Sequence, residues 1–192
     1  MTTLVNRLVE FSDALRFKDL PAAVVSESKR LLLDSIGCAI AALGTDKGQM
    51  AVKVAKDMGG PPEARIIGTA TSVSTSAAAF ANGELINTLD YDALISPPGH
   101  VAPYVIPAML AVAEKHRSSG RDLVRALAVA HEVSARFGSA MADVRDVPAG
   151  QKISFPAITG YSSSIFGGTL GTAMLVGKIG RASCRERVFG RV

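Results

Sequence analysis

The sequence predicts an all-α domain, and three observations carry this prediction. Apolar residues make up 48% of the 192 residues, yet aromatic residues make up only 5% and tryptophan is absent, which favours closely packed helices over an aromatic-rich sheet. Apolar residues recur at helical spacing through most of the chain. Strands do not alternate with helices as they would in a βαβ unit. The length suits one domain, or one domain with a fragment of another.

Helical periodicity is clear in the first third of the chain. Residues 3–17 carry a leucine or phenylalanine every three or four positions, which predicts an amphipathic helix. A longer helix is expected from the segment DLP at residues 19–21, since proline is tolerated in a first helical turn, to about Leu43. Residues 47–58 predict a shorter helix, and the segment GGPP at residues 59–62 ends it.

A capping signal predicts the start of a long helix later in the chain. Ser119 is followed three residues later by Asp122, a pair that can satisfy free N–H groups at a helix start. This helix is expected to run to about Met141. The other expected elements are a short strand or extended connector at residues 64–68, helices at residues 74–89, 103–116 and 162–177, and a loop at residues 143–161.

Charge is concentrated at the C-terminal end. Residues 181–192 contain four arginines and one glutamate, a net charge of +3, so the other 180 residues carry +1 of the formal +4. A nearly neutral body lacks the basic surface that binds nucleic acid, and no nucleic-acid partner is expected. Residues 179–192 resemble translated adaptor sequence and are expected to be a non-native tail, which sets residues 1–178 apart as the domain.

Membrane insertion is not expected from this sequence. The first residues, MTTLVNRLVEFSD, mix charged and apolar side chains and do not predict a signal peptide. The longest uncharged apolar run, residues 101–113, contains two prolines and is shorter than the roughly 20 residues of a spanning helix. We therefore expect a soluble, cytoplasmic protein with no membrane partner. The isolated Cys38 and Cys184 predict neither a disulfide framework nor a zinc site, and no metal is expected.

Asp90, Asp92 and His100 form the strongest candidate site. Asp90 is expected at the end of one helix and His100 just before the next, with the stiff segment PPG at residues 97–99 between them. A carboxylate beside an imidazole stabilises the imidazolium, and an imidazole suits proton transfer near neutral pH. The same spacing also fits a purely local role, in which Asp90 caps or pairs locally and His100 caps the following helix.

Other polar groups predict less. His116 and His131 have no partners at ligand spacing, and structural roles are expected for both. The glycine-rich segment at residues 166–171 has no preceding strand and lacks the G-x-G-x-x-G spacing, so close helix packing is expected there. Ser162 and Ser163 stand at the start of the last expected helix, where hydroxyls and free backbone N–H groups can bind an anionic substrate.

Several segments resemble the MmgE/PrpD family. The block AAAFANGELINTLDYD, the proline loop with His100, and PYVIPAMLAVAEKHRSSGRDLVRALAVAHEVSARFG carry the resemblance, which extends over nearly all of residues 3–178. It is specific from Asn82 to Asp92 and in the segment SGR at residues 119–121. The resemblance implies a helical domain that carries most of the active site, a smaller lid domain that is absent from this chain, and usually a homodimer.

The resemblance also implies a reaction. The family includes 2-methylcitrate dehydratase, cis-aconitate decarboxylase and iminodisuccinate epimerase, which move a proton next to a carboxylate of a small di- or tricarboxylate, generally without an organic cofactor. It assigns His100 as the acid/base group and Asp90 as the residue that orients or charges it. Asp92, Ser162 and Ser163 are expected to bind the substrate. The expected function is thus a lyase or isomerase like 2-methylcitrate dehydratase, incomplete and weakly active or inactive in this chain.

The sequence departs from the family at positions near this site. Ala93 and Leu94 stand where the family commonly has a second acid and a threonine, and Ser162 stands where many members have histidine. These departures favour a divergent subgroup with another substrate. They also support an alternative of a different class, a non-catalytic helical binding or dimerisation module.

Overall fold

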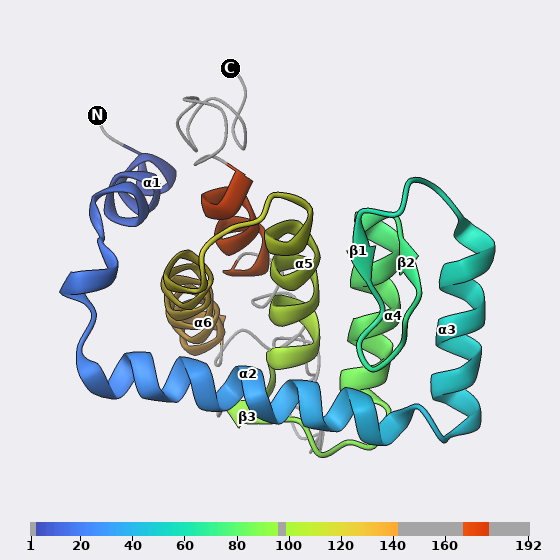
Figure 1. The fold of residues 1–192 in the computed structure, drawn as a ribbon. Helices are drawn as coiled ribbons and strands as arrows, with labels where there is room; N and C mark the ends of the chain where they lie inside the picture. Colours follow the sequence, from blue (N-terminus) through green and yellow to red (C-terminus); the bar gives the residue numbers. More distant parts are fainter. Residues whose placement is uncertain (1–2, 96–98, 142–166, 177–192) are drawn as a thin grey trace, which may run out of the picture.

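The computed structural model describes residues 3–95, 99–141 and 167–176, and it is an all-α domain (Figure 1). Four short strands form two antiparallel pairs within it. The helices are α1 (Leu4–Ala14), the 3₁₀ turn η1 (Phe17–Asp19), α2 (Ala22–Ala42), α3 (Asp46–Met58), α4 (Thr75–Asn87), α5 (Ala102–Lys115) and α6 (Gly120–Met141), followed by helical residues 167–176. The strands are β1 (Ala64–Arg65), β2 (Ser72–Val73), β3 (Leu94–Ile95) and β4 (Gly99–His100).

Most of the expected helices are confirmed, and the differences have local causes. The helix expected over residues 3–17 ends at Ala14, because Leu15 has extended dihedral angles (φ −62°, ψ 129°). The chain then forms η1, where the Asp19 carboxylate accepts a 2.9 Å hydrogen bond from the backbone N–H of Arg16. The short strand or extended connector expected at residues 64–68 contains β1, which pairs with β2. The loop expected at residues 143–161 lies outside the described residues.

Helix α4 is the centre of the packing. Figure 1 shows it between α3 and α5, while α2 lies across the base of the view and contacts α4, α5 and α6. The buried face of α4 is rich in alanine, which lets neighbouring helices approach closely. Seven of the largest fully buried side chains among the described residues are Ile66, Leu85, Ile86, Ile106, Met109, Leu127 and Leu175.

A close contact joins α4 to α5 at a glycine. A Cβ atom on Gly83 would lie 3.0 Å from the carbonyl oxygen of Pro103 and 3.7 Å from Cγ of Pro107. Pro107 lies inside α5 and has no N–H group to donate to the carbonyl four residues before it, which is that of Pro103. The two helices therefore pack where the α5 backbone hydrogen bonding is interrupted. This contact lies about one turn before the end of α4, where the loop that carries the candidate site begins.

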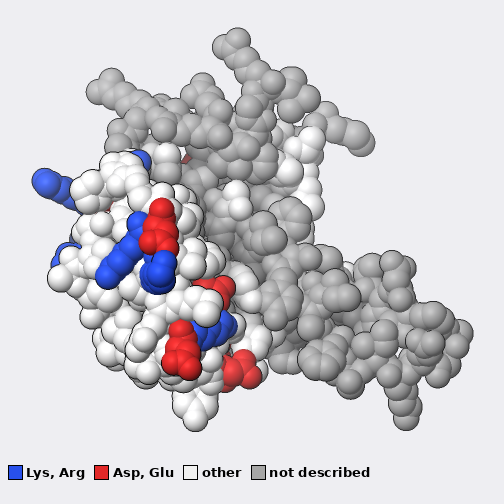
Figure 2. Space-filling model, turned by 90° about the vertical axis from the view of Figure 1, so that its right-hand side faces the viewer, with Lys and Arg blue, Asp and Glu red and all other residues white. Residues whose placement is uncertain are grey.

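Acidic and basic side chains lie next to one another on the face shown in Figure 2. Exposed ion pairs on α3 and α4 are of this kind, with 2.5 Å between Lys53 and Asp57 and 3.4 Å between Lys47 and Glu84. Such a mixture is consistent with the small net charge of residues 1–180. None of the helices in the described part of the chain combines the length and the apolar character needed to cross a lipid bilayer.

Candidate active site

The candidate site begins at the turn that follows α4. The helix ends at Asn87, and the backbone N–H of Asp90 donates a 3.1 Å hydrogen bond to the Asn87 carbonyl. Asp90 has a φ of 56°, in the left-handed region. Aspartate is among the few residues other than glycine that adopt this conformation readily, because its short side chain can form local hydrogen bonds. The turn ends α4 and sends the chain towards β3.

Strand pairing returns the chain to the same place. In the antiparallel pair of β3 and β4, Leu94 lies opposite His100 and Ile95 lies opposite Gly99. Gly99 has a φ of 107°, a conformation that side-chain-bearing residues rarely adopt. Helix α5 begins two residues after His100. The positions expected for Asp90, just beyond one helix, and for His100, just before the next, are confirmed.

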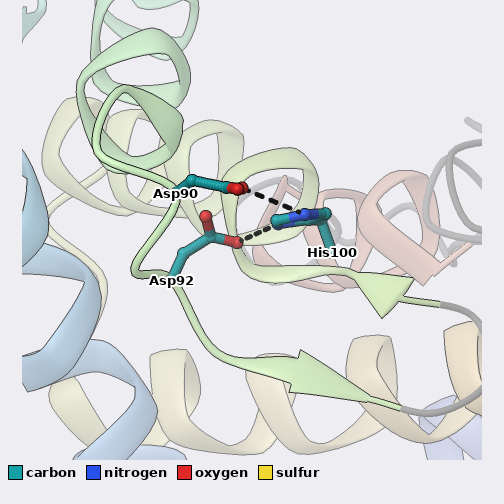
Figure 3. A group of neighbouring side chains, drawn as sticks. All are labelled: Asp90, Asp92 and His100. Carbon is teal, nitrogen blue, oxygen red and sulfur yellow. Dashed lines mark hydrogen bonds and ion pairs between the residues drawn. The ribbon is translucent and has the colours of Figure 1, made fainter.

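The carboxylates of Asp90 and Asp92 both face the imidazole of His100 (Figure 3). His100 Nδ1 lies 2.8 Å from Asp92 Oδ2, and His100 Nε2 lies 3.3 Å from Asp90 Oδ1. The two carboxylates differ sharply in environment, since the side chain of Asp92 is 0% exposed and that of Asp90 is 80% exposed. The imidazole is intermediate, at 27%.

Asn87 extends this group into α4. Its Nδ2 donates a 3.3 Å hydrogen bond to Asp92 Oδ1, so both oxygens of the buried carboxylate have partners. Sequence reasoning missed Asn87. The available signal was a polar side chain in the last turn of the helix, five residues before Asp92.

The arrangement is suited to moving a proton. A carboxylate can only accept hydrogen bonds, so a ring nitrogen that bonds to one carries a proton. When both nitrogens of His100 are protonated, the imidazolium donates towards Asp92 on one side and Asp90 on the other. The local alternative of His100 as a helix cap is not what the geometry shows. The N-cap of α5 is Val101, and both ring nitrogens of His100 face carboxylates.

The described residues also bring together a potential ligand set for a cation. One ligand atom from each of Asp90, Asp92 and His100 lies within 4.8 Å of the others. Carboxylate oxygens and an imidazole nitrogen suit several divalent metals. However, Nδ1 of His100 is already hydrogen-bonded to Asp92. The accessible metal ligands are then His100 Nε2 and the carboxylate of Asp90.

The sequence matches the family that its motifs resemble. Residues 6–183 match the MmgE/PrpD N-terminal domain. The chain belongs to the MmgE/PrpD family. It is 34% identical over 165 residues to the cis-aconitate decarboxylase-like protein oryM of Aspergillus oryzae, covering 80% of this chain and 34% of that protein. Identity to the cis-aconitate decarboxylase of Mus musculus is 26% over 180 residues, and to that of Homo sapiens 28% over 187 residues. Each alignment covers 90% of this chain and 35% of the relative.

This MmgE/PrpD chain therefore spans about a third of the length of the curated relatives it matches. Two expected substrate-binding residues, Ser162 and Ser163, lie outside the described residues. The positions of Ala93 and Leu94, which depart from the family pattern, follow directly on the site. The side chain of Leu94 is exposed, as is that of Tyr91, so apolar surface borders the polar group.

The remaining histidines and glycines have structural positions. His131 Nδ1 donates a 2.9 Å hydrogen bond to the Leu127 carbonyl, and burial lowers the pKa of the imidazole. His116 is the C-cap of α5. In the glycine-rich segment, a Cβ atom on Gly167 would overlap the Ala130 carbonyl oxygen, and one on Gly171 would lie 2.5 Å from Met109 Sδ. The described part of this segment packs closely against α5 and α6, as predicted.

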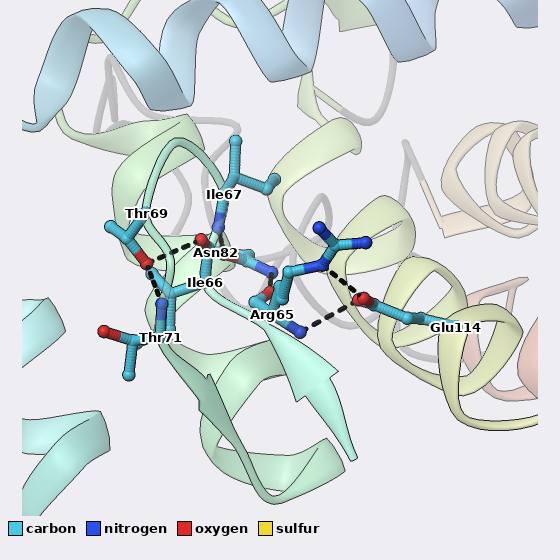
Figure 4. Close-up of polar contacts among 7 residues, drawn as sticks. All are labelled: Arg65, Ile66, Ile67, Thr69, Thr71, Asn82 and Glu114. Atoms are coloured by element: carbon cyan, nitrogen blue, oxygen red, sulfur yellow. Dashed lines mark hydrogen bonds and ion pairs between the residues drawn. The ribbon is translucent and has the colours of Figure 1, made fainter. Parts of the chain in front are cut away.

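Asn82, the first residue of the segment specific to MmgE/PrpD, has a structural position in another part of α4 (Figure 4). Its side chain is buried. Oδ1 accepts a 2.9 Å hydrogen bond from the N–H of Ile67, and Nδ2 donates a 3.1 Å hydrogen bond to the Arg65 carbonyl. Glu114 of α5 accepts hydrogen bonds from both Nε and the backbone N–H of Arg65, at 2.7 and 2.9 Å. Asn82 thus attaches the β1–β2 hairpin to α4.

Clefts among the described residues lie beside these groups. Asn87, Tyr104 and Gly83 line a cleft of about 260 Å³ between α4 and α5. A larger cleft, of about 680 Å³, is bordered by Arg65, Asn82 and the end of α5. His100 lines neither of these two clefts. The geometry of the imidazole and its carboxylates, rather than cleft volume, therefore identifies the candidate site.

Proposed function

We propose that this chain is part of a lyase that transfers a proton at the carbon next to a carboxylate of a small di- or tricarboxylic acid. The observation that carries the proposal is the imidazole of His100, held between the buried Asp92 at 2.8 Å and the exposed Asp90 at 3.3 Å. Positioned imidazoles are the commonest acid/base groups in enzymes. Membership in the MmgE/PrpD family and the names of the relatives support this reaction class.

The first substrate to test is cis-aconitate, because the relatives named above are cis-aconitate decarboxylases or similar to them. In the decarboxylation of cis-aconitate, the carbon–carbon bond to one carboxylate breaks and carbon dioxide leaves. The electron pair that remains on the carbon skeleton takes a proton, which His100 Nε2 supplies. Water then returns a proton to the imidazole. For 2-methylcitrate, the same nitrogen would remove a proton next to a carboxylate while hydroxide leaves from the neighbouring carbon. The hydroxide then takes up the proton that the imidazolium releases, so that water forms and the imidazole becomes neutral again.

The charges at the site indicate that the substrate needs further partners. With the imidazole protonated, His100, Asp90 and Asp92 together carry a net charge of −1. A substrate with two or three carboxylates is repelled by such a group unless cationic side chains bind it. We propose that regions present in the relatives beyond the length of this chain supply those cations. The chain alone is then expected to have little or no turnover.

A direct test uses the extended protein, meaning this chain together with the remaining length that its relatives have. Proton NMR would follow the consumption of cis-aconitate and of 2-methylcitrate. His100→Gln is expected to lower kcat by about 10²–10⁴-fold, the usual range for a lost acid/base group. The matched control is His116→Gln, the same change at a helix end. Turnover that survives His100→Gln unaltered would refute the proposed role of His100.

A second candidate function is a non-catalytic binding or dimerisation module. Ala93 and Leu94 next to the site favour it, since they stand where the family commonly has an acid and a threonine. The side chain of Leu94 is exposed and places apolar surface there. Light scattering and turnover measurements on the extended protein distinguish the two. A stable dimer without turnover of any di- or tricarboxylate supports the module, whereas turnover that depends on His100 supports the lyase.

A further inference from the structure

We infer that Asp92, held by Asn87, is the positioning residue for His100, and that Asp90 is the partner beside the nitrogen that exchanges its proton. Sequence reasoning gave the orienting role to Asp90 and a substrate-binding role to Asp92. The inference deepens the proposed function and takes its catalytic meaning from it. The hydrogen-bond assignment itself can be tested without any turnover.

Burial is the first argument for Asp92. Its side chain is 0% exposed, and a buried carboxylate is costly unless its oxygens have hydrogen-bond partners. Oδ2 faces His100 Nδ1 at 2.8 Å, within the 2.7–2.9 Å range that is typical of charge-assisted bonds. Oδ1 accepts from Asn87 at 3.3 Å. Loss of either hydrogen bond would leave an oxygen of the buried carboxylate without a partner, since the side chain has no contact with solvent. The contact between Asp92 Oδ2 and His100 Nδ1 is therefore expected to persist.

The second argument concerns the proton on each ring nitrogen. Because a carboxylate only accepts, His100 Nδ1 must donate to Asp92 in the neutral imidazole as well as in the imidazolium. The neutral ring is then the Nδ1–H tautomer, and Nε2 is the nitrogen that gains and loses the proton. The backbone supports the same ring position, because the pairing of Leu94 with His100 fixes the strand that carries the imidazole.

Asp90 differs from Asp92 in every one of these respects. It is 80% exposed, and its oxygen lies 3.3 Å from Nε2. Water can hydrate this carboxylate in any orientation, so its contact with Nε2 is exchangeable. Asp90 can therefore stabilise the protonated ring and move aside when a reacting carbon takes its place. Asp92 thus holds the ring in position, and Asp90 lies beside the nitrogen whose proton is exchanged.

Asn87 makes the assignment testable, because its amide nitrogen determines how a substituted residue 92 would be oriented. In Asp92→Asn, the amide oxygen is expected to keep the bond from Asn87 Nδ2, and the new NH₂ group then faces His100 Nδ1. A donor at that position requires an unprotonated Nδ1, so the neutral ring switches to the Nε2–H tautomer. The double variant Asn87→Asp with Asp92→Asn reverses the pair and is expected to restore the Nδ1–H tautomer.

The experiment is ¹⁵N NMR of histidine-labelled protein, using the 192-residue chain, at a pH where the imidazole is neutral. The His100 signals are identified by their loss in His100→Gln. The expected results are an Nδ1–H tautomer in the unchanged chain and in Asp90→Asn, Nε2–H in Asp92→Asn, and Nδ1–H in the double variant. Asp90→Asn is the matched control, since it makes the same chemical change and asparagine also tolerates the left-handed φ.

Two results would overturn the inference. An Nε2–H tautomer in the unchanged chain would do so alone, whether or not any variant folds. A tautomer that responds to Asp90→Asn but not to Asp92→Asn would return the positioning role to Asp90. Failure of the proposed function has a different signature. The extended protein would then show no turnover, while the ¹⁵N shifts of His100 in the 192-residue chain would still report the expected tautomers.

Discussion

The hydrogen bonds of Asn82 predict a measurable loss of stability when its side chain is truncated. Asn82→Ala removes the acceptor of the Ile67 N–H at 2.9 Å and the donor to the Arg65 carbonyl at 3.1 Å. Each hydrogen bond contributes about 0.5–1.5 kcal/mol net, and a polar group that stays buried without a partner costs about 1–3 kcal/mol. Asn82 is 1% exposed, so water does not readily replace its side chain as a hydrogen-bond partner. We expect a loss of about 2–4 kcal/mol in the free energy of unfolding.

Urea denaturation of the chain followed by circular dichroism measures this loss. Hydrogen exchange of the Ile67 amide tests the cause of this loss, because the β1–β2 hairpin should open locally when the Asn82 hydrogen bonds are removed. The control is Gln49→Ala on the exposed face of α3, which is expected to change stability by less than about 0.5 kcal/mol. If Asn82→Ala is as stable as this control, or if Ile67 exchange is unaltered, the hairpin is not held by Asn82.

Three further predictions concern pH and metals. Hydrogen bonds from Lys115, at 2.8 Å, and Thr75 lower the pKa of Glu63 to about 2. The associated stabilisation is complete above pH 4.5 and lost as pH falls towards 2, so Glu63→Gln should flatten acid denaturation there. Burial lowers the pKa of His131, so the unfolded chain binds more protons below about pH 6.5. The melting temperature should fall as pH decreases from there, and less so in His131→Gln. EDTA should leave the melting temperature unchanged, and a decrease that is absent in Asp90→Asn would indicate a metal bound at the candidate site.

The long helices could be predicted from the sequence because their apolar side chains repeat at the helical period. The same reasoning placed Asp90 and His100 at the two ends of one loop, since both helix boundaries are marked by local sequence. A short strand or extended connector was expected at residues 64–68, but the pairing of the strands could not be predicted in this way. Each strand of β1–β2 and β3–β4 has only two residues, too few for an alternating pattern to appear.

The different environments of the two aspartates could not be predicted either. Asp90 and Asp92 are two positions apart with no intervening signal that separates them. The left-handed φ of Asp90 and the amide of Asn87 distinguish them, and both depend on how α4 ends and packs. The spacing of acidic residues and histidine in the sequence therefore predicts the candidate site, while the roles of the individual residues depend on tertiary structure.

The asymmetry between the carboxylates also explains how a single imidazole can serve a reaction in which its charge changes. If both partners were exposed, the ring would rotate freely and lose the orientation that proton transfer requires. If both were buried, loss of the proton from Nε2 would leave two carboxylates facing a neutral ring in a medium that screens charge poorly. With Asp92 buried against Asn87 and Asp90 in contact with water, the ring keeps its position through Nδ1 while solvent adjusts to the charge at Nε2. Exchanging the exposures of the two carboxylates should therefore impair the proposed proton transfer even if every hydrogen-bonding group were retained.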